Sequence, residues 1–520
     1  MGFRILVMPL VAVCHGLIVR LRVTGSASLR CVTGSASAVP CACQAGAFGW
    51  AVNERATGSA SAVSGVKKLM FAAITGIISA LPVSNGELLA QEAELNAAAH
   101  APRESAQFLG VDRCERCHQA PTKADVDNRV TDFVLLNESK VWMSDIHSRA
   151  YQLIDPAISS LSKQICDKLH IADISQAQQC LSCHSNWLQG NDRPLTYDRG
   201  VACESCHGPS EHWDVPHSSA DWRKKPVAEK IALGMIDVRN PIERAEQCFG
   251  CHIGSAAEGK ILTHEMYAAG HPPLPGIEIE SFAQQMPRHW RYLDEKVTDA
   301  ISNRSGDETG DTPFAFFDEF LRENHRYLKL DEQDVNKQTA SHNHRAAAVV
   351  LGGVIALRES LERIRDFASD APPRASVWPE LATFDCRACH HELATASWRQ
   401  QREDQQRDDT VPGRPRIATW PTVLIRLAIR HVSPTRPIYD QNLSAFDAKF
   451  AALQSELQRS PFGSASRVHA VCSELAAWLT TEVVEPVSAK PFDDRGVADA
   501  INVLIVIGST EPHEYDAARQ

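Results

Sequence analysis

The sequence predicts a mainly α-helical protein with an irregular first part and a helical C-terminal part. From residue 91 to about 280 the chain is dense in Cys, His, Pro and Gly and has few long periodic runs, which predicts short helices and loops. After about residue 281, apolar residues recur at spacings of three and four, the pattern of amphipathic helices. A chain of 520 residues has room for two or three domains.

The first 90 residues contain a low-complexity segment and a predicted export signal. Thr-Gly-Ser-Ala-Ser recurs at Thr24, Thr33 and Thr57, so we interpret residues 1–65 as an extension that forms no core, with a start-site artefact as one explanation. Residues 66–90 have the pattern of a secretory signal peptide, two lysines before a short apolar run. The apolar stretch 5–19 is an alternative anchor, so membrane association is expected through the N-terminus only.

Helices are predicted at defined positions along the rest of the chain. In the first part, residues 141–154 are expected to form one helix. In the second part, residues 281–520, three apolar stripes predict amphipathic helices: Val350 to Ile364, Leu443 to Leu457 and Val468 to Val483. Two further apolar runs, 423–429 and 501–507, are expected to be buried, and the charged segment 399–416 is expected to be an exposed loop.

One pentapeptide, Cys-x-x-Cys-His, occurs five times and is the attachment signal for c-type haem. In this signal the two thiols form thioethers to one haem and the adjacent histidine binds its iron. The sequence therefore predicts five covalently attached haems c. The predicted attachment cysteines are Cys114, Cys117, Cys180, Cys183, Cys203, Cys206, Cys248, Cys251, Cys386 and Cys389. The predicted proximal iron ligands are His118, His184, His207, His252 and His390.

The remaining histidines are numerous enough to supply a second ligand to every iron. Fifteen histidines remain between His100 and His513 after the five proximal ones, whereas the chain has only seven methionines. A second imidazole stabilises ferric iron, so bis-histidine ligation is expected for most haems. His264 and His289 are candidate distal ligands on this count.

Zinc is the competing interpretation for two of the motifs. Cys180, Cys183, Cys203 and Cys206 have a spacing within the range of zinc ribbons. Zinc, however, requires no particular residue after each cysteine pair, whereas histidine follows all five pairs. Haem attachment is therefore the favoured interpretation.

Charge and cysteine use restrict the partners and the compartment. The formal net charge of −11 argues against a nucleic-acid partner. Because c-type haem is attached outside the cytoplasm, the protein is expected to be periplasmic or otherwise exported. Outside the motifs, Cys166 and Cys472 are expected to be small core residues, with a disulfide between them as the alternative.

Residues from about 112 to 280 resemble the tetrahaem cytochrome c-554 family of nitrifying bacteria. The resemblance is carried by the stretches Trp142 to Ala150, Gly200 to His212 and His264 to Pro272. It implies a tetrahaem region over residues 91–280, haems in close pairs, mostly helical structure and electron transfer in nitrogen metabolism. It also implies that His147, His212 and His271 are distal ligands. The fifth motif and the long helical tail depart from the family pattern.

Two functions remain open at this stage. The first is a multihaem cytochrome that transfers electrons between redox partner proteins, in nitrogen or respiratory metabolism. The alternative is an oxidoreductase that acts on a small nitrogen or sulfur compound at one five-coordinate haem. A minority interpretation is that the C-terminal helices mainly bind a partner enzyme or a second subunit; the sequence leaves the oligomeric state unknown.

Overall fold

The computed structural model describes residues 10–14, 17–22, 30–32, 106–119, 137–188, 191, 196–219, 221–222, 225–290, 340–369, 378–390, 414–459 and 462–510. The chain forms two compact units, Met1–Leu81 and Pro82–Gln520. The predicted signal peptide, the loop before residue 414 and the three low-complexity repeats lie wholly or largely outside the described residues.

The described part of the N-terminal unit is a small antiparallel sheet. Its strands are β1 (Leu10–Cys14), β2 (Leu17–Arg22) and β3 (Arg30–Val32), in the order β1-β2-β3. In the first pair, Val13 lies opposite Ile18. The apolar stretch 5–19, considered above as an anchor, therefore contributes to two strands. Within the described part of the chain, every helix is too short or too polar to cross a bilayer.

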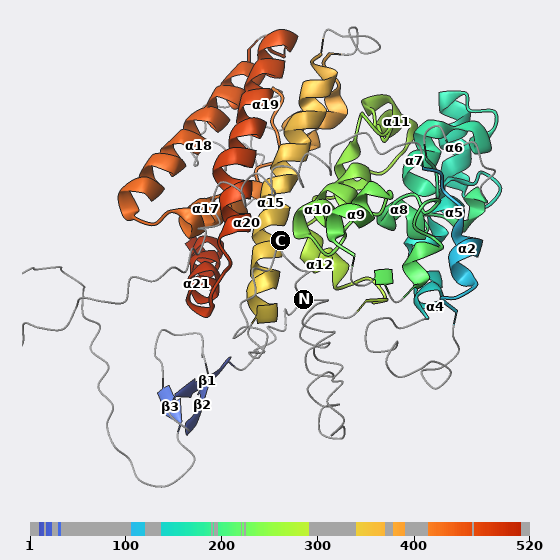
Figure 1. Cartoon of the computed structure of the whole chain (residues 1–520). Helices are drawn as coiled ribbons and strands as arrows, with labels where there is room; N and C mark the ends of the chain where they lie inside the picture. The colour runs from blue at the N-terminus through green and yellow to red at the C-terminus, as the bar shows by residue number, and fades with distance from the viewer. Residues whose placement is uncertain are drawn as a thin grey trace, which may run out of the picture. The chain divides into compact units, whose positions relative to one another are not determined.

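The second unit begins with a region of short helices, as predicted (Figure 1). Most of them are one or two turns long, and glycines with positive φ, such as Gly200 and Gly208, lie between them. The helices are α2 (Val111–Glu115), α4 (Glu138–Met143), η2 (His147–Arg149), α5 (Ala150–Ile154), α6 (Ser160–Leu169), η3 (Ile174–Gln176), α7 (Gln178–His184), η4 (Tyr197–Arg199), α8 (Cys203–His207), η5 (Pro216–Ser218), α9 (Val227–Ala232), α10 (Pro241–Phe249), η7 (Gly250–Gly254), α11 (His264–Ala269) and α12 (Ile279–Ala283).

The single helix expected over residues 141–154 is three pieces, α4, η2 and α5. The break has a polar cause. The buried Asp145 carboxylate accepts a hydrogen bond from the His147 backbone N–H at 3.0 Å, which replaces a regular helical bond. His147 is thereby presented from a turn and not from a continuous helix.

The C-terminal part consists of longer helices that share one apolar core, which confirms the mainly α prediction. The helices are α15 (Ala340–Phe367), η10 (Leu381–Thr383), η11 (Cys386–Ala388), α17 (Pro421–Val432), α18 (Arg436–Leu457), α19 (Ala465–Leu479), η12 (Thr480–Val484), α20 (Glu485–Ala489) and α21 (Asp494–Thr510). The 28-residue helix α15 contacts α10, α17 and α19 and is the centre of this core.

The apolar stripe predicted on α15 is buried along its whole length. Its five residues are each at most 3% exposed: Val350, Val354, Leu357, Leu361 and Ile364. Three residues of the α18 stripe, Phe446, Leu453 and Leu457, are also in the core. Burying side chains of this size stabilises the fold by about 1.5–3 kcal/mol each.

The two shorter apolar runs differ in outcome. Residues 423–429 lie in α17 and include the fully buried Ile425 and Ile429, as expected. Residues 501–507 form part of α21, but Ile501, Ile505 and Val506 are more than half exposed, so the prediction of burial was wrong there. The apolar run therefore predicted a helix correctly, but burial depends on neighbouring elements that the run does not reveal.

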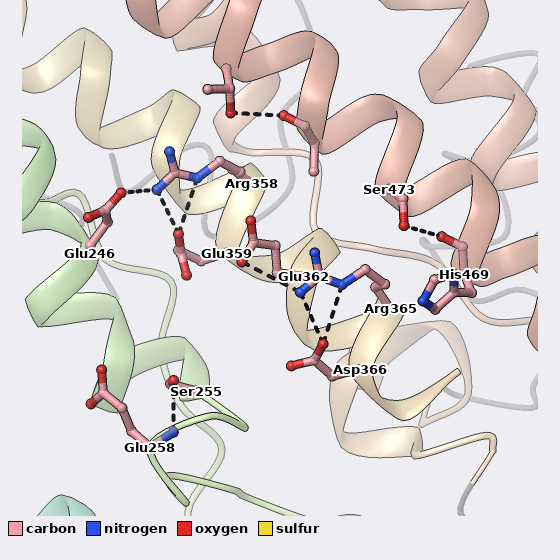
Figure 2. Close-up of polar contacts among 12 residues, drawn as sticks. Glu246, Ser255, Glu258, Arg358, Glu359, Glu362, Arg365, Asp366, His469 and Ser473 are labelled. Carbon is pink, nitrogen blue, oxygen red and sulfur yellow. Dashed lines mark hydrogen bonds and ion pairs between the residues drawn. The ribbon is translucent and has the colours of Figure 1, made fainter. Parts of the chain in front are cut away.

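Charged side chains join α15 to the short-helix region. Figure 2 shows that Arg358 of α15 reaches Glu246 of α10, and its guanidinium also contacts the neighbouring Glu359. Arg358 is only 7% exposed, so its charge depends on these two carboxylates. The pKa of Glu359 rises to about 7, chiefly because of burial. Farther along α15, Arg365 pairs with Asp366 at 3.1 Å.

The packing of α15 against α17 predicts opposite effects for two adjacent glycines. A Cβ at Gly353 would lie 2.5 Å from Leu424, whereas a Cβ at Gly352 has no neighbour within 3.7 Å. Gly353→Ala should lower the free energy of unfolding by about 1–3 kcal/mol through overpacking. Gly352→Ala is the matched control and should raise it by up to about 1 kcal/mol through helix propensity. Thermal unfolding of the two holoprotein variants tests this, and equal midpoints would contradict the packing.

Candidate functional site

Each of the five motifs lies on one turn of helix. The second and third motifs are contained in α7 and α8, and the first begins in α2. The fourth runs from α10 into η7, and the fifth begins in η11. Residues three and four positions apart share one helix face, so the two thiols and the imidazole of a motif point to the same side. This is the arrangement that one covalently attached haem requires.

Every motif imidazole faces a second imidazole from elsewhere in the chain. The separations of the ring centroids are 6.2 Å for His118 and His217, 6.2 Å for His184 and His271, 6.4 Å for His207 and His289, 6.3 Å for His252 and His147, and 6.1 Å for His390 and His264. The ring planes are near-parallel in two pairs, at 13° for His118 and 22° for His390. They are close to perpendicular in the other three, at 74–80°.

These separations fit an iron atom between the two rings. Two metal–nitrogen bonds of about 2 Å, plus about 1.1 Å from each nitrogen to its ring centre, give roughly 6.2 Å. The observed values lie within 0.2 Å of this estimate. The five pairs can therefore hold five six-coordinate haem irons.

Four of the five expected distal histidines face a motif ring, and one does not. Each of these four rings faces the proximal histidine of one motif; they belong to His147, His264, His271 and His289. His212 is exposed in a turn, and the ring that faces His118 belongs to His217.

We therefore take His217, and not His212, as the candidate second ligand opposite His118. His217 lies in η5, and Trp213 packs edge-on against its ring at 5.4 Å. The His217 ring is held by Trp213 and by the turn that Pro216 begins. Neither residue is a sequence signal for a ligand. His217 stands 99 residues from His118, and no periodicity connects them.

Hydrogen bonds at Nδ1 leave Nε2 available for iron in several of these rings. The Nδ1–H of His118 donates to Glu138 at 2.9 Å, and that of His147 donates to the buried Asp145 at 3.0 Å. In His184 and His271 the acceptors are backbone carbonyls, those of Ala150 at 3.1 Å and Pro272 at 2.7 Å. A bond of this kind fixes the tautomer and orients a ligating imidazole.

The motif imidazoles differ in their electrostatic environment. The hydrogen bond to Glu138 raises the pKa of His118. Burial lowers the pKa of His207 and His252 to about 4, so both rings are neutral at physiological pH. Neutral imidazole is the form that binds a metal.

The first four motifs line one continuous cavity of about 2150 Å³. This is more than twice the upper end for a drug-sized ligand site, about 1000 Å³. Exposed apolar side chains line this cavity and suit contact with porphyrin; they include Ile146, Leu153 and Val215. Arg239 and Arg244 also line the cavity, where their guanidinium groups pair with Asp237 and Glu280.

Motifs meet in two pairs at their cysteines, which argues against the zinc interpretation. The thiols of Cys114 and Cys203 lie close enough to change each other's pKa, and so do those of Cys183 and Cys251. The first motif thus adjoins the third, and the second adjoins the fourth. No group of three or more possible zinc-type ligands is present among the described residues. Close haem pairs, which the resemblance implied, fit this arrangement.

Two of the cysteines outside the motifs, Cys166 and Cys472, are core residues. Cys166 of α6 is buried, Cys472 of α19 is fully buried within the helical core, and neither forms a disulfide. The core interpretation made from the sequence is confirmed.

The fifth motif is joined to the rest by a half-buried arginine and a buried glutamate. Arg363 of α15 donates to the backbone carbonyls of Ile253 at 2.7 Å, Leu262 at 3.0 Å and Ala382 at 3.1 Å. Glu380 accepts from the backbone amides of His264 at 2.7 Å and Ala382 at 2.9 Å. These bonds fix the residue that faces His390 relative to the fourth and fifth motifs.

Comparisons with known proteins agree with the motif pattern. Residues 113–208, which contain the first three motifs, match the family model described as cytochrome c554 and c-prime. Cytochrome c-554 of Nitrosomonas europaea is 23% identical over 154 residues, which are 28% of this chain and 58% of that protein. The chain thus spans a little over half of that relative's length. The comparison with solved structures finds no match.

The ring geometry predicts that His217, and not His212, completes the first haem. Replacing His217 by Ala should convert one low-spin ferric haem to a high-spin, five-coordinate one, because the second imidazole is lost. His212→Ala is the matched control from the same segment and should leave the spectrum unchanged. Electron paramagnetic resonance of the ferric holoproteins distinguishes them. A high-spin signal in His212→Ala would restore the sequence-based assignment.

The carboxylate at His118 predicts a specific shift in redox potential. Glu138 withdraws the Nδ1 proton of His118 and so favours ferric iron. Glu138→Gln should raise the midpoint potential of one haem by roughly 30–60 mV, a three- to tenfold change in a one-electron equilibrium. A spectroelectrochemical titration measures this. Glu229→Gln, which removes an exposed carboxylate paired with Lys225, should shift no haem.

Proposed function

We propose that this chain, whose residues 113–208 match the c554 family model, is a five-haem c-type cytochrome that carries electrons between redox partner proteins outside the cytoplasm. The single observation that supports it most is the second imidazole opposite every motif histidine. An iron with two imidazole ligands exchanges electrons without binding a substrate.

The arrangement of the motifs supports the same proposal. Four motifs share one cavity, and their cysteines approach one another across motif boundaries, as in the pair Cys114 and Cys203. Haems attached there would be in close contact, and electron transfer is fastest between centres in close contact. Differences in ligand hydrogen bonding would give the haems different potentials, so that electrons move in a preferred direction.

The alternative, an oxidoreductase with one open haem, is less well supported. An open site needs an iron with a free position and acid–base groups around it. Each of the five motif rings instead has a partner ring within 6.4 Å. We therefore place the protein among electron carriers, in nitrogen or respiratory metabolism as the resemblance to cytochrome c-554 implies.

Export is part of the proposal. Covalent attachment of haem c takes place outside the cytoplasm, and the lysine-led apolar run at residues 66–90 has the pattern of a secretory signal. Mass spectrometry of protein matured in a competent host should show five added haems on a chain that begins near Gln91.

The spin state of the haems tests the proposal directly. The ferric holoprotein should show only low-spin haems, insensitive to cyanide and nitric oxide. They should fall into two classes, two haems with near-parallel and three with near-perpendicular imidazoles, since ring orientation sets the anisotropy of the signal. A high-spin fraction of one haem in five that binds cyanide would overturn the carrier in favour of the open-site enzyme.

A further inference from the structure

The fifth motif lies outside the cavity that the other four share. His118, His184, His207 and His252 all line that cavity and are half-buried. His390 does not line it and is exposed, as are both cysteines of its motif. A haem attached there is a terminal centre, and it needs a connection to the others in order to exchange electrons with them.

One short segment contributes a facing imidazole to both the fifth and the second motifs. Helix α11 begins at His264, whose ring faces His390, and ends at Ala269. Two residues later His271 faces His184 of the second motif. The backbone from residue 264 to 271 therefore runs from one ligand position to the next, over a helix of about 9 Å.

An aromatic ring lies within this segment. Tyr267 is on α11 between the two histidines, and its ring centroid is 6.2 Å from that of His271. Helix α11, which carries it, contacts η10, the turn directly before the fifth motif, and the charges of Arg363 and Cys386 act on its phenol. Tyr267 thus lies beside His271, which faces the second motif, and on a helix that adjoins the fifth motif.

The segment is held at both ends. At its start, the His264 amide is bound by Glu380, and Thr263 caps the helix through the Met266 amide. At its end, Gln164 of α6 donates to the Ala269 carbonyl at 3.2 Å. Fixed atoms provide a constant electronic coupling, which a mobile loop would not.

We propose that electrons pass between the haems of the fifth and second motifs along α11, with the Tyr267 ring filling the space between His271 and the fifth motif. This rests on the electron-carrier function proposed above. One electron moves in each transfer, supplied or accepted by a redox partner protein, and no bond forms or breaks. Tyr267 keeps its proton and is not itself oxidised; its ring supplies a packed path in place of solvent.

A competing connection exists at the fourth motif. Arg363 bonds the carbonyl of Ile253, next to His252, and the carbonyl of Ala382, close to Cys386. This route runs through an aliphatic side chain and hydrogen bonds and has no aromatic ring, so it should couple the two sites less strongly. The two routes differ in whether they depend on Tyr267.

The test times the arrival of electrons at the fifth haem. His264→Met serves as a label, because a Met ligand raises the potential of that haem and makes it the electron acceptor with a distinct spectrum. The other haems are reduced by a flash-generated flavin radical, and absorbance follows the labelled haem. In this background Tyr267→Leu should slow the arrival about tenfold, whereas Tyr267→Phe should keep it within about threefold. Tyr439→Leu in α18, far from the motifs in sequence, is the control and should change nothing.

The outcomes separate this inference from the function on which it rests. Equal rates in Tyr267→Leu and its parent would overturn the α11 route and leave the Arg363 connection. Equal slowing by Leu and Phe would also overturn it, because the ring would not be the coupling element. Unchanged midpoint potentials and low-spin signals in each Tyr267 variant exclude a displaced His271. Failure of the carrier function would instead appear as haems that a chemical reductant cannot reduce reversibly.

Discussion

The short-helix region of the fold depends on one constraint: pairs of imidazole rings must face each other about 6 Å apart. Among the described residues there, the buried apolar cluster apart from the helical core is small, consisting of Val111, Trp142 and Ala202. The helical part, in contrast, buries a large continuous core around α15. Short helices without such a core are not stable alone, and haems attached at the motifs, as proposed above, would supply the missing interactions.

The same constraint explains the polar groups near the ligand rings. Asp145 is buried although it is a carboxylate, and it receives both the backbone N–H and the Nδ1–H of His147. The cost of burying it is offset by these two bonds. It also fixes the ring, so one residue interrupts the local helix and orients a ligand candidate. Glu380 has the comparable role for the backbone of His264.

Periodicity and motif chemistry predicted the parts of the structure that local sequence determines. The stripe on α15 was predicted because its side chains repeat every turn. The five motifs were recognised because each is a local pattern of five residues. The resemblance indicated His147 and His271. The position of His217 opposite His118 was missed, because a residue on a single 3₁₀ turn has no pattern of its own and its neighbour is set by a distant segment of the chain. The exposure of α21 was missed for the same reason, since burial depends on the neighbouring elements.

The five ring pairs also determine how the chain is threaded. The two histidines of a pair are between 82 and 126 residues apart in the sequence. Along the chain, the first histidine of each pair comes before the second histidine of the preceding pair. The pairs are 118 with 217, 147 with 252, 184 with 271, 207 with 289 and 264 with 390. With iron in place, these are interlocking cross-links. A cross-link over about 100 residues removes roughly 4.7 kcal/mol of loop-closure entropy from the unfolded chain in the chain-entropy model. If the fifth pair also holds a haem, as proposed, its bonds to His264 and His390 would close the last of these overlapping loops along the chain.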